Sequence, residues 1–193
     1  PSITEATLYL GTGILELFSD ETVDLSPSAE ANLSKLVIAN TTGDGFFVFT
    51  NDPNLISGKI GRNGKIDGVT FNISLSEWER VQLIAASNTP GGDKSTLVLD
   101  AHNGFIHDIG LKDNLDNLNI LINEIADTIH PVVETATLNL TDGILVVTTN
   151  EIIDTTPVSR VNLSKIILTN ETSFDPPHGL TLLNSRITAY DDF

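Results

Sequence analysis

Residues 6–18 read ATLYLGTGILELF, and residues 136–148 read ATLNLTDGILVVT. In both stretches two runs rich in apolar side chains flank a short segment that contains glycine, and apolar and polar side chains alternate clearly in Thr7-Leu8-Tyr9-Leu10. Strands with one buried face show this alternation, and the Asp142-Gly143 pair is a strong signal for a hairpin turn. The two stretches therefore predict the same β-hairpin at two places in the chain.

The similarity extends well beyond the hairpin. At the fixed spacing of 136 − 6 = 130 residues, 16 of the 37 positions aligned between residues 6–42 and 136–172 are identical. Asn32-Leu33-Ser34-Lys35, for example, returns as Asn162-Leu163-Ser164-Lys165. A repeat of this length indicates that a whole domain has been duplicated.

The spacing of the repeat predicts the domain boundary. We expect one domain in residues 1–129 and an incomplete second copy in residues 130–193, which reaches only position 193 − 130 = 63 of the first copy. Half of a sandwich would expose strand edges and an open core. Two explanations stay open: the chain is a piece of a longer protein, or a partner chain supplies the missing strands.

Short β-branched runs separated by turn residues predict many strands in the first domain. The predicted strands are residues 5–10, 13–19, 32–39, 45–50, 55–60, 65–74, 95–101 and 104–109. Ser76 and Glu79 form a capping box, with Ser74 and Glu77 as an alternative frame, and predict one helix over residues 76–87 in which Trp78 faces the core. The predicted fold is all-β: an immunoglobulin-like (Ig-like) β-sandwich with one short helix, followed by a partial second copy.

Several reaction and ligand classes are disfavoured by the composition. The net charge of −16 repels phosphate backbones, which argues against nucleic-acid binding. The absence of cysteine excludes disulfides and thiolate metal sites. We find no nucleophile elbow, no phosphate-binding loop and no zinc-binding helix, and no apolar run of the roughly 20 residues that cross a bilayer. We therefore predict a protein that is not an enzyme.

Further segments carry a resemblance to a known family. They are residues 15–24 (LELFSDETVD), 76–86, 88–93 (NTPGGD), 97–100 (LVLD) and 106–109 (IHDI). The first looks like the opening of bacterial and archaeal Ig-like surface domains, and the others resemble the tandem domains of archaeal surface-layer (S-layer) proteins. The resemblance implies an extracellular, cell-surface protein that assembles with itself into an array or filament, is glycosylated, binds calcium and contacts cell-surface glycans. Where the family has a Gly-Asn-Pro turn, this chain has residues 110–114 (GLKDN), a departure that affects any inherited metal site.

Oxygen-bearing side chains gather in two places and suggest calcium sites, because hard cations prefer oxygen ligands. The first candidate ligands are Asp108, Asp113, Asn114 and Asp116, and the second are Asp20, Glu21 and Asp24. The alternative is that these Asp and Asn side chains only stabilise turns by bonding to nearby backbone.

Asn-x-Ser/Thr sequons provide candidate glycosylation sites. The candidates are Asn32, Asn40, Asn139, Asn162 and Asn170, among which Asn40 and Asn170 lie at predicted strand ends.

Three functional hypotheses remain. The first is a structural subunit of a self-assembling S-layer or extracellular filament. The second is a calcium-dependent adhesin stalk, in which these domains hold a binding tip away from the cell. The third is an accessory Ig-like module of a secreted enzyme, which would require a catalytic domain elsewhere.

Overall fold

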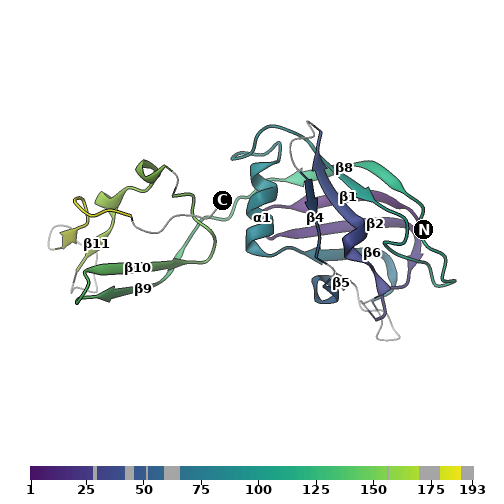
Figure 1. Cartoon of the computed structure of the whole chain (residues 1–193), viewed down its shortest axis with the longest axis horizontal. Coiled ribbons are helices and arrows are strands. Elements are labelled where there is room, and N and C mark those ends of the chain that lie inside the picture. Colours follow the sequence, from purple (N-terminus) through teal and green to yellow (C-terminus); the bar gives the residue numbers. More distant parts are fainter. Residues whose placement is uncertain are drawn as a thin grey trace. The chain divides into compact units, whose positions relative to one another are not determined.

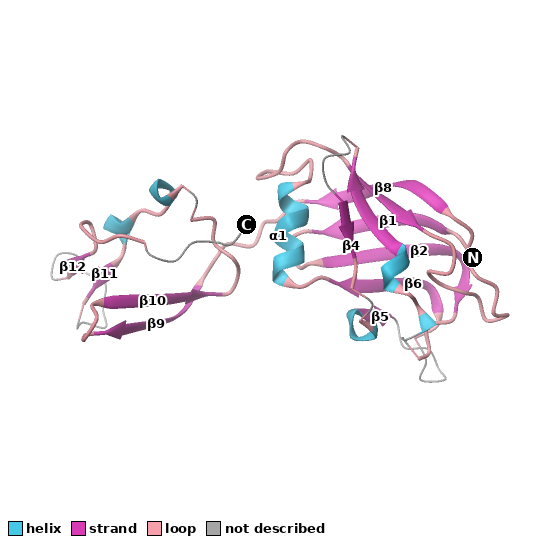
Figure 2. Cartoon of the chain, viewed as in Figure 1, coloured by secondary structure: helices cyan, strands magenta, loops and turns pink. Residues whose placement is uncertain are grey.

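The computed structural model divides the chain into two compact units, Pro1–His130 (unit 1) and Pro131–Phe193 (unit 2), which are shown in Figure 1. The structure describes residues 1–27, 30–41, 46–50, 52–58, 66–155, 157–169 and 179–187. Within these ranges the protein is mostly β-strand with a single α-helix, as the sequence predicts (Figure 2). None of the helices in the described ranges is long and apolar enough to span a membrane.

Unit 1 contains one large curled sheet of eight strands. The strands are β1 (Ile3–Tyr9), β2 (Ile14–Val23), β3 (Leu36–Asn40), β4 (Phe46–Val48), β5 (Ile56–Gly58), β6 (Gly68–Ser74), β7 (Leu97–Ala101) and β8 (Asn117–Ile125). Their order across the sheet is β4-β3-β7-β8-β1-β2-β6-β5. Every neighbouring pair is antiparallel except β1 and β8, which are parallel. Two short 3₁₀-helices, η2 (Leu33–Lys35) and η3 (Pro53–Leu55), precede β3 and β5.

Strand β8 joins the two halves of the sheet. Its first part pairs antiparallel with β7, where Leu121 lies opposite Val98. Its last part pairs parallel with β1, beginning where Ile122 lies opposite Ala6. One strand therefore contacts both halves, and the sheet can curl around a single interior.

The core of unit 1 draws side chains from both halves of the sheet. Leu8, Leu17 and Phe71 belong to the half made of β1, β2, β6 and β5, and Ile38 and Leu99 belong to the half made of β3, β4 and β7. All five are at most 1% exposed and form one contiguous cluster. The alternating pattern of the hairpin explains this burial, because every second residue of a strand faces the same side.

Helix α1 (Glu77–Ala85) lies at one end of the strands of unit 1 (Figure 2). The predicted capping box is confirmed: Glu79 N donates to Ser76 Oγ, and Ser76 N donates to Glu79 Oε2. The prediction that Trp78 faces the core is wrong, since this side chain is 54% exposed. Leu83 turns inward in its place.

A buried arginine attaches the helix to the sheet. Arg80 is 5% exposed, and its Nη1 donates to Leu10 O at 3.0 Å, just beyond the end of β1. The same nitrogen pairs with Asp127 at 2.7 Å, and Nε pairs with Glu77 at 2.7 Å. Two carboxylates and a carbonyl thus provide hydrogen-bond partners for the buried guanidinium. Without such partners, the burial of this charge would be costly.

The predicted strands differ from the observed ones mainly after β7. Residues 104–109 form a turn with isolated bridges and no strand, and Gly104 there has φ of 76°. Strand β8, the last of unit 1, has no clear strand signal in the sequence, because four of its nine residues are polar or charged. Its backbone is also irregular, since Asn119 has a left-handed φ of 60°. Asparagine is depleted in strands, so local preference does not reveal this one.

The described part of unit 2 contains two separate strand pairs. The first joins β9 (Val133–Asn139) and β10 (Ile144–Thr149), and the second joins β11 (Ile167–Leu168) and β12 (Leu180–Thr181). Two 3₁₀-helices, η4 (Val158–Arg160) and η5 (Leu163–Lys165), lie between β10 and β11.

The β9–β10 hairpin has the geometry of β1–β2 at a spacing of 130 residues. Leu138 lies opposite Leu145 as Leu8 lies opposite Leu15, and the turn glycines Gly13 and Gly143 have φ of 65° and 66°. Both hairpins carry an irregularity in register near the start of their first strand. Helix η5 likewise stands 130 residues after η2.

Side chains at equivalent positions of the β1–β2 and β9–β10 hairpins differ strongly in exposure. Leu8 and Leu10 are fully buried, whereas Leu138 and Leu140 are 41% and 84% exposed. A hairpin with the same apolar pattern is therefore covered in unit 1 and open in the described part of unit 2.

The core of unit 1 provides a stability test. Leu17→Ala should lower the free energy of unfolding by about 2–5 kcal/mol, because it leaves a cavity at a fully buried position. Leu121→Ala is the matched control, since that leucine is 69% exposed, and should cost less than about 0.5 kcal/mol. Urea denaturation followed by the fluorescence of Trp78, the only tryptophan, measures both changes in unit 1. Equal effects of the two substitutions would contradict the core described above.

Candidate functional site

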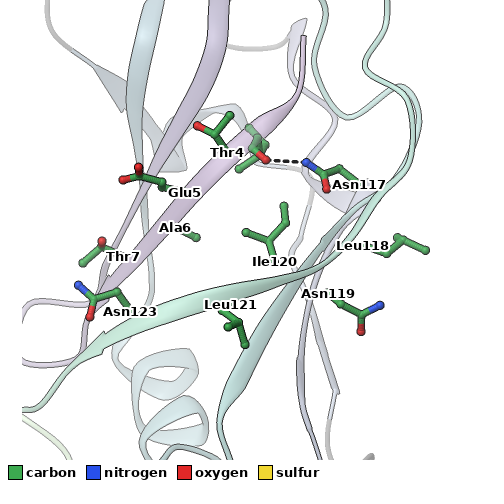
Figure 3. A pocket seen from close by; sticks show the side chains of 11 residues that line it. Thr4, Glu5, Ala6, Thr7, Asn117, Leu118, Asn119, Ile120, Leu121 and Asn123 are labelled. Carbon is green, nitrogen blue, oxygen red and sulfur yellow. Dashed lines mark hydrogen bonds between the residues drawn. The ribbon is translucent and has the colours of Figure 1, made fainter.

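An open groove of about 480 Å³ lies where β1 and β8 diverge in unit 1 (Figure 3). The two strands pair only from Ala6 and Ile122 onward, and before that point Asn117 Nδ2 spans the gap by donating to Ile3 O. The groove is lined by Ile3, Thr4, Glu5, Ala6, Thr7, Asn117, Leu118, Asn119, Ile120, Leu121 and Asn123. The splitting of β8 between two partner strands therefore creates the groove.

The side chains of the groove have limited chemistry. Of the eleven residues that line it, Glu5 is the only one with an ionisable side chain. A single carboxylate can act as a general base, and the lining of the groove supplies no second ionisable side chain to pair with it. The asparagine and threonine side chains of the groove supply hydrogen-bonding groups, and Leu121 supplies apolar surface.

The loop of the first predicted calcium site is organised around Asn114. This residue is 1% exposed, and its Oδ1 accepts hydrogen bonds from Phe105 N and Ile106 N at 2.9 and 3.0 Å. Its Nδ2 donates to His102 O and Leu115 O. The side-chain amide is thus fully used in fixing residues 102–106, and its oxygen already has two donors.

The carboxylates of the same loop also bond to backbone. Asp108 Oδ1 accepts from Lys112 N at 3.0 Å, and Asp116 Oδ1 accepts from Asn103 N at 2.8 Å. The hydrogen bond from Lys112 N, followed by one from Gly110 N, lowers the pKa of Asp108 below its usual value of 3.8. Asp113 takes part in a β-bridge with His107.

The second predicted calcium site shows a similar pattern. Asp20 Oδ1 accepts from Ser2 N at 2.7 Å, and Asp24 Oδ1 accepts from Ser26 N at 3.2 Å. Glu21 is exposed at the end of β2. In the part of the chain that the structure describes, no group of three or more His, Cys, Asp or Glu side chains could hold a metal ion. Calcium binding at either place stays a prediction.

The sequons lie in different surroundings. Asn40 is 5% exposed, and its Nδ2 donates to Asp93 Oδ2 at 3.3 Å, a buried position that is unfavourable for glycan attachment. Asn139 and Asn162 are exposed, and Asn32 is half-buried. In both Asn32 and Asn162, Oδ1 accepts from the hydroxyl of the sequon serine at 2.6 Å. Asn170 lies outside the described residues.

Two features of possible functional use were missed by the sequence analysis. The groove of Figure 3 depends on β8, whose asparagine-rich sequence gave no strand signal. The buried ion cluster of Arg80 was also missed, although an arginine three residues after Glu77 on a helix is a recognisable ion-pair spacing.

Comparison of the chain with protein-family models, with curated proteins and with solved structures gives no match.

The role of Asn114 can be tested by substitution. Asn114→Ala should lower the free energy of unfolding by about 1–3 kcal/mol, because it leaves the buried N–H group of Ile106 without its acceptor. Phe105 N loses one of its two acceptors and keeps the other, His102 O. Asn123→Ala, on an exposed asparagine of β8, is the control and should change stability by less than about 0.5 kcal/mol. Chemical denaturation at neutral pH measures both, and a neutral Asn114→Ala would show that the loop does not need this side chain.

The lowered pKa of Asp108 predicts a dependence of stability on pH. A carboxyl whose pKa is lower in the folded state stabilises the fold above its unfolded pKa, and this contribution is lost as pH falls through the folded pKa. Asp108→Asn should therefore be less stable than the wild type near neutral pH, and the difference should close below pH 3.8. Thermal unfolding between pH 7 and pH 3 measures this; a difference that stays constant over the range would contradict the assignment.

Proposed function

We propose that this chain is a non-enzymatic structural protein of tandem Ig-like domains, an extracellular subunit that assembles with itself at a cell surface. The observation that supports this most is the strand pairing of unit 1. An Ig-type sandwich has strands A, B, E and D in one sheet and C, F and G in the other, with C′ added beside C in some members. With β1 to β8 taken as A, B, C, C′, D, E, F and G, the order β4-β3-β7-β8-β1-β2-β6-β5 becomes C′-C-F-G-A-B-E-D.

The repeated geometry supports the tandem part of the proposal. In the same notation β9 and β10 are strands A and B, and β11 is strand C of a second domain. Strand β12 pairs with β11 as β4 pairs with β3, but it lies at positions equivalent to 50–51, after the end of β4. Hydrogen bonds repeat together with the strands: Asp20 Oδ1 accepts from Ser2 N, and Asn150 Oδ1 accepts from Val132 N. Glu30 N donates to Pro27 O, and Arg160 N donates to Pro157 O. Equal local contacts at a constant spacing are the expected consequence of domain duplication.

The polar side chains of unit 1 favour a structural role over a catalytic one. Asn114 stabilises a loop by accepting hydrogen bonds from its backbone, and Arg80 attaches the helix to the sheet. Asp108 and Asp116 accept hydrogen bonds from nearby backbone. In each case the polar atoms bond within the protein itself, whereas a catalytic group needs one partner to be substrate. The net charge of −16 gives these domains a repulsive field, which a divalent cation would reduce when copies approach one another.

An adhesin stalk is the second candidate. The observation that favours it is the return of the β1–β2 hairpin as β9–β10 in a second unit of the same chain, because a stalk needs repeated domains and no lateral contacts. The two candidates differ in their lateral association, and one experiment separates them.

Assembly can be measured directly on the purified chain. In the presence of calcium we expect ordered sheets or filaments by negative-stain electron microscopy and fast-sedimenting species by analytical ultracentrifugation, because calcium reduces repulsion between acidic surfaces. Removal of calcium with a chelator should return the protein to slow-sedimenting particles. Sodium chloride at matched ionic strength is the control that separates specific calcium binding from screening. A monodisperse monomer under all three conditions would exclude the array or filament and favour the stalk.

A further inference from the structure

We infer that unit 1 bears tension along the chain, because its first and last strands form a parallel pair that side chains tie together at both ends. The strands are β1 and β8, which lie side by side in the sheet (Figure 2). We call this pair, with its ties from Asn117 and Arg80, the terminal clamp. The inference goes beyond the proposed function, since it concerns contacts within unit 1 alone and does not depend on self-assembly.

The directions of β1 and β8 determine how a pulling force acts on them. Because the two strands are parallel, they start at one end of the pair and finish at the other. The chain enters the pair at the start of β1 and leaves it at the end of β8, which are opposite ends. A pull on the two sides of unit 1 therefore makes the strands slide along each other, and every bond of the ladder resists at the same time. In an antiparallel pair such as β1–β2, a pull on the two free ends would open the bonds one after another.

The backbone ladder of the clamp is short. Four residue pairs are in register, from Ala6 with Ile122 to Tyr9 with Ile125, and Leu10 N donates to Ile125 O at 2.9 Å just beyond them. The first pair, Ala6 and Ile122, is at most 4% exposed, so this part of the ladder lies on the core. Hydrogen bonds are electrostatically stronger in such surroundings than in water. With only four pairs, the contacts at the two ends of the ladder add substantially to its strength.

Asn117 ties the strands at the end where they diverge. Its Nδ2 donates to Ile3 O, a contact between residues 114 positions apart in the chain (Figure 3). The backbone ladder does not reach this point, since the strands pair only from Ala6 and Ile122 onward. A side chain thus replaces the missing backbone bonds and lengthens the contact that resists sliding.

Arg80 ties the strands at the other end. Its Nη1 donates to Leu10 O at 3.0 Å and pairs with Asp127 Oδ2 at 2.7 Å, so one nitrogen joins the chain after β1 to the chain after β8. The two segments also lie close together, because a Cβ at Gly11 would be 3.2 Å from Asp127 Oδ1 and 3.5 Å from Ile129. Arg80 is 5% exposed, and hydrogen bonds of charged groups are roughly twice as strong as neutral ones. This tie is therefore the stronger of the two.

General stabilisation of the fold is the competing explanation for the same contacts. The two explanations differ in their dependence on direction. A tie of the clamp slows forced unfolding only when the force passes from β1 to β8, whereas a contact that merely stabilises the fold acts for every direction of pull. The direction of the force is therefore the variable to test.

Single-molecule pulling on the 193-residue chain tests the clamp. The chain has no native cysteine, so pairs of introduced cysteines define where the force acts. Ser2→Cys with Thr128→Cys pulls from the start of β1 to the end of β8 and makes the strands slide. Thr12→Cys with Thr128→Cys pulls on the ends that lie together and opens the pair from one side. At the same constant force, we expect unit 1 to stay folded longer in the sliding geometry, where its unfolding releases roughly 400 Å of chain at about 3.4 Å per residue.

Substitution of the two ties adds a second measurement. In the sliding geometry, Asn117→Ala should shorten the lifetime of folded unit 1 about fivefold, which corresponds to about 1 kcal/mol for one hydrogen bond. Asp127→Ala removes a charge-assisted bond and should shorten the lifetime by about tenfold or more. Asn123→Ala, on an exposed asparagine of the same strand, is the matched control and should leave the lifetime unchanged.

A pull that bypasses the clamp separates it from general stabilisation. Thr12→Cys with Val69→Cys sends the force through β2 and β6, which are neighbours in the sheet. In this geometry neither Asn117→Ala nor Asp127→Ala should change the lifetime. Equal shortening in both geometries would overturn the inference, and so would equal lifetimes of the wild-type fold under sliding and opening. Either result leaves the proposed function in place, because self-assembly is measured separately with and without calcium.

Discussion

The β1–β2 hairpin can be buried only if both of its outer edges are paired, and the rest of unit 1 is arranged around this constraint. Each strand of the hairpin carries backbone N–H and C=O groups on its free edge, which cost free energy when they are buried without partners. In unit 1, β6 pairs with one edge and β8 with the other. Because β8 also pairs with β7, the same strand brings the other half of the sheet over the apolar face of the hairpin. Burial of Leu8 and Leu17 therefore depends on strands that occur up to about a hundred residues later in the chain.

This dependence explains which parts of the fold can be predicted from sequence. The hairpin, the 130-residue repeat and the Ser76–Glu79 capping box are local patterns, and the structure has the hairpin geometry twice and the capping box where it was predicted. Strand β8 is different, since its asparagines favour turns and its position is determined by the edges of β1 and β7. Trp78 shows the same limit, because helical spacing identifies an apolar face but not which side of the helix the sheet contacts.

The predicted calcium loop shows why site residues are harder to predict than strands. Asp and Asn bind cations through the same oxygens that accept hydrogen bonds from backbone, so their clustering in sequence fits both roles. In the structure Asn114 Oδ1 accepts from two backbone N–H groups, and Asp108 Oδ1 accepts from Lys112 N. The lowered pKa of Asp108 has the same cause, since these hydrogen bonds favour its charged form. Residue type alone does not distinguish an Asp or Asn that binds a cation from one that stabilises a loop. The positions of the nearest backbone N–H groups make this distinction.

The contrast between the two units shows how strongly burial of a hairpin depends on the strands that cover it. Leu138 and Leu140 are the equivalents of Leu8 and Leu10 in sequence, and Leu138 also in register. Leu138 and Leu140 are 41% and 84% exposed, whereas Leu8 and Leu10 are fully buried. Since the hairpins have the same local geometry, the difference comes from the segment that covers one of them and not the other. The apolar pattern of a hairpin therefore predicts its strand geometry, whereas the burial of its side chains depends on strands elsewhere in the chain. Register matters as well as pairing, because a shift of β6 by one residue would turn Phe71 and Ile73 away from the apolar face on which Leu17 and Leu15 lie.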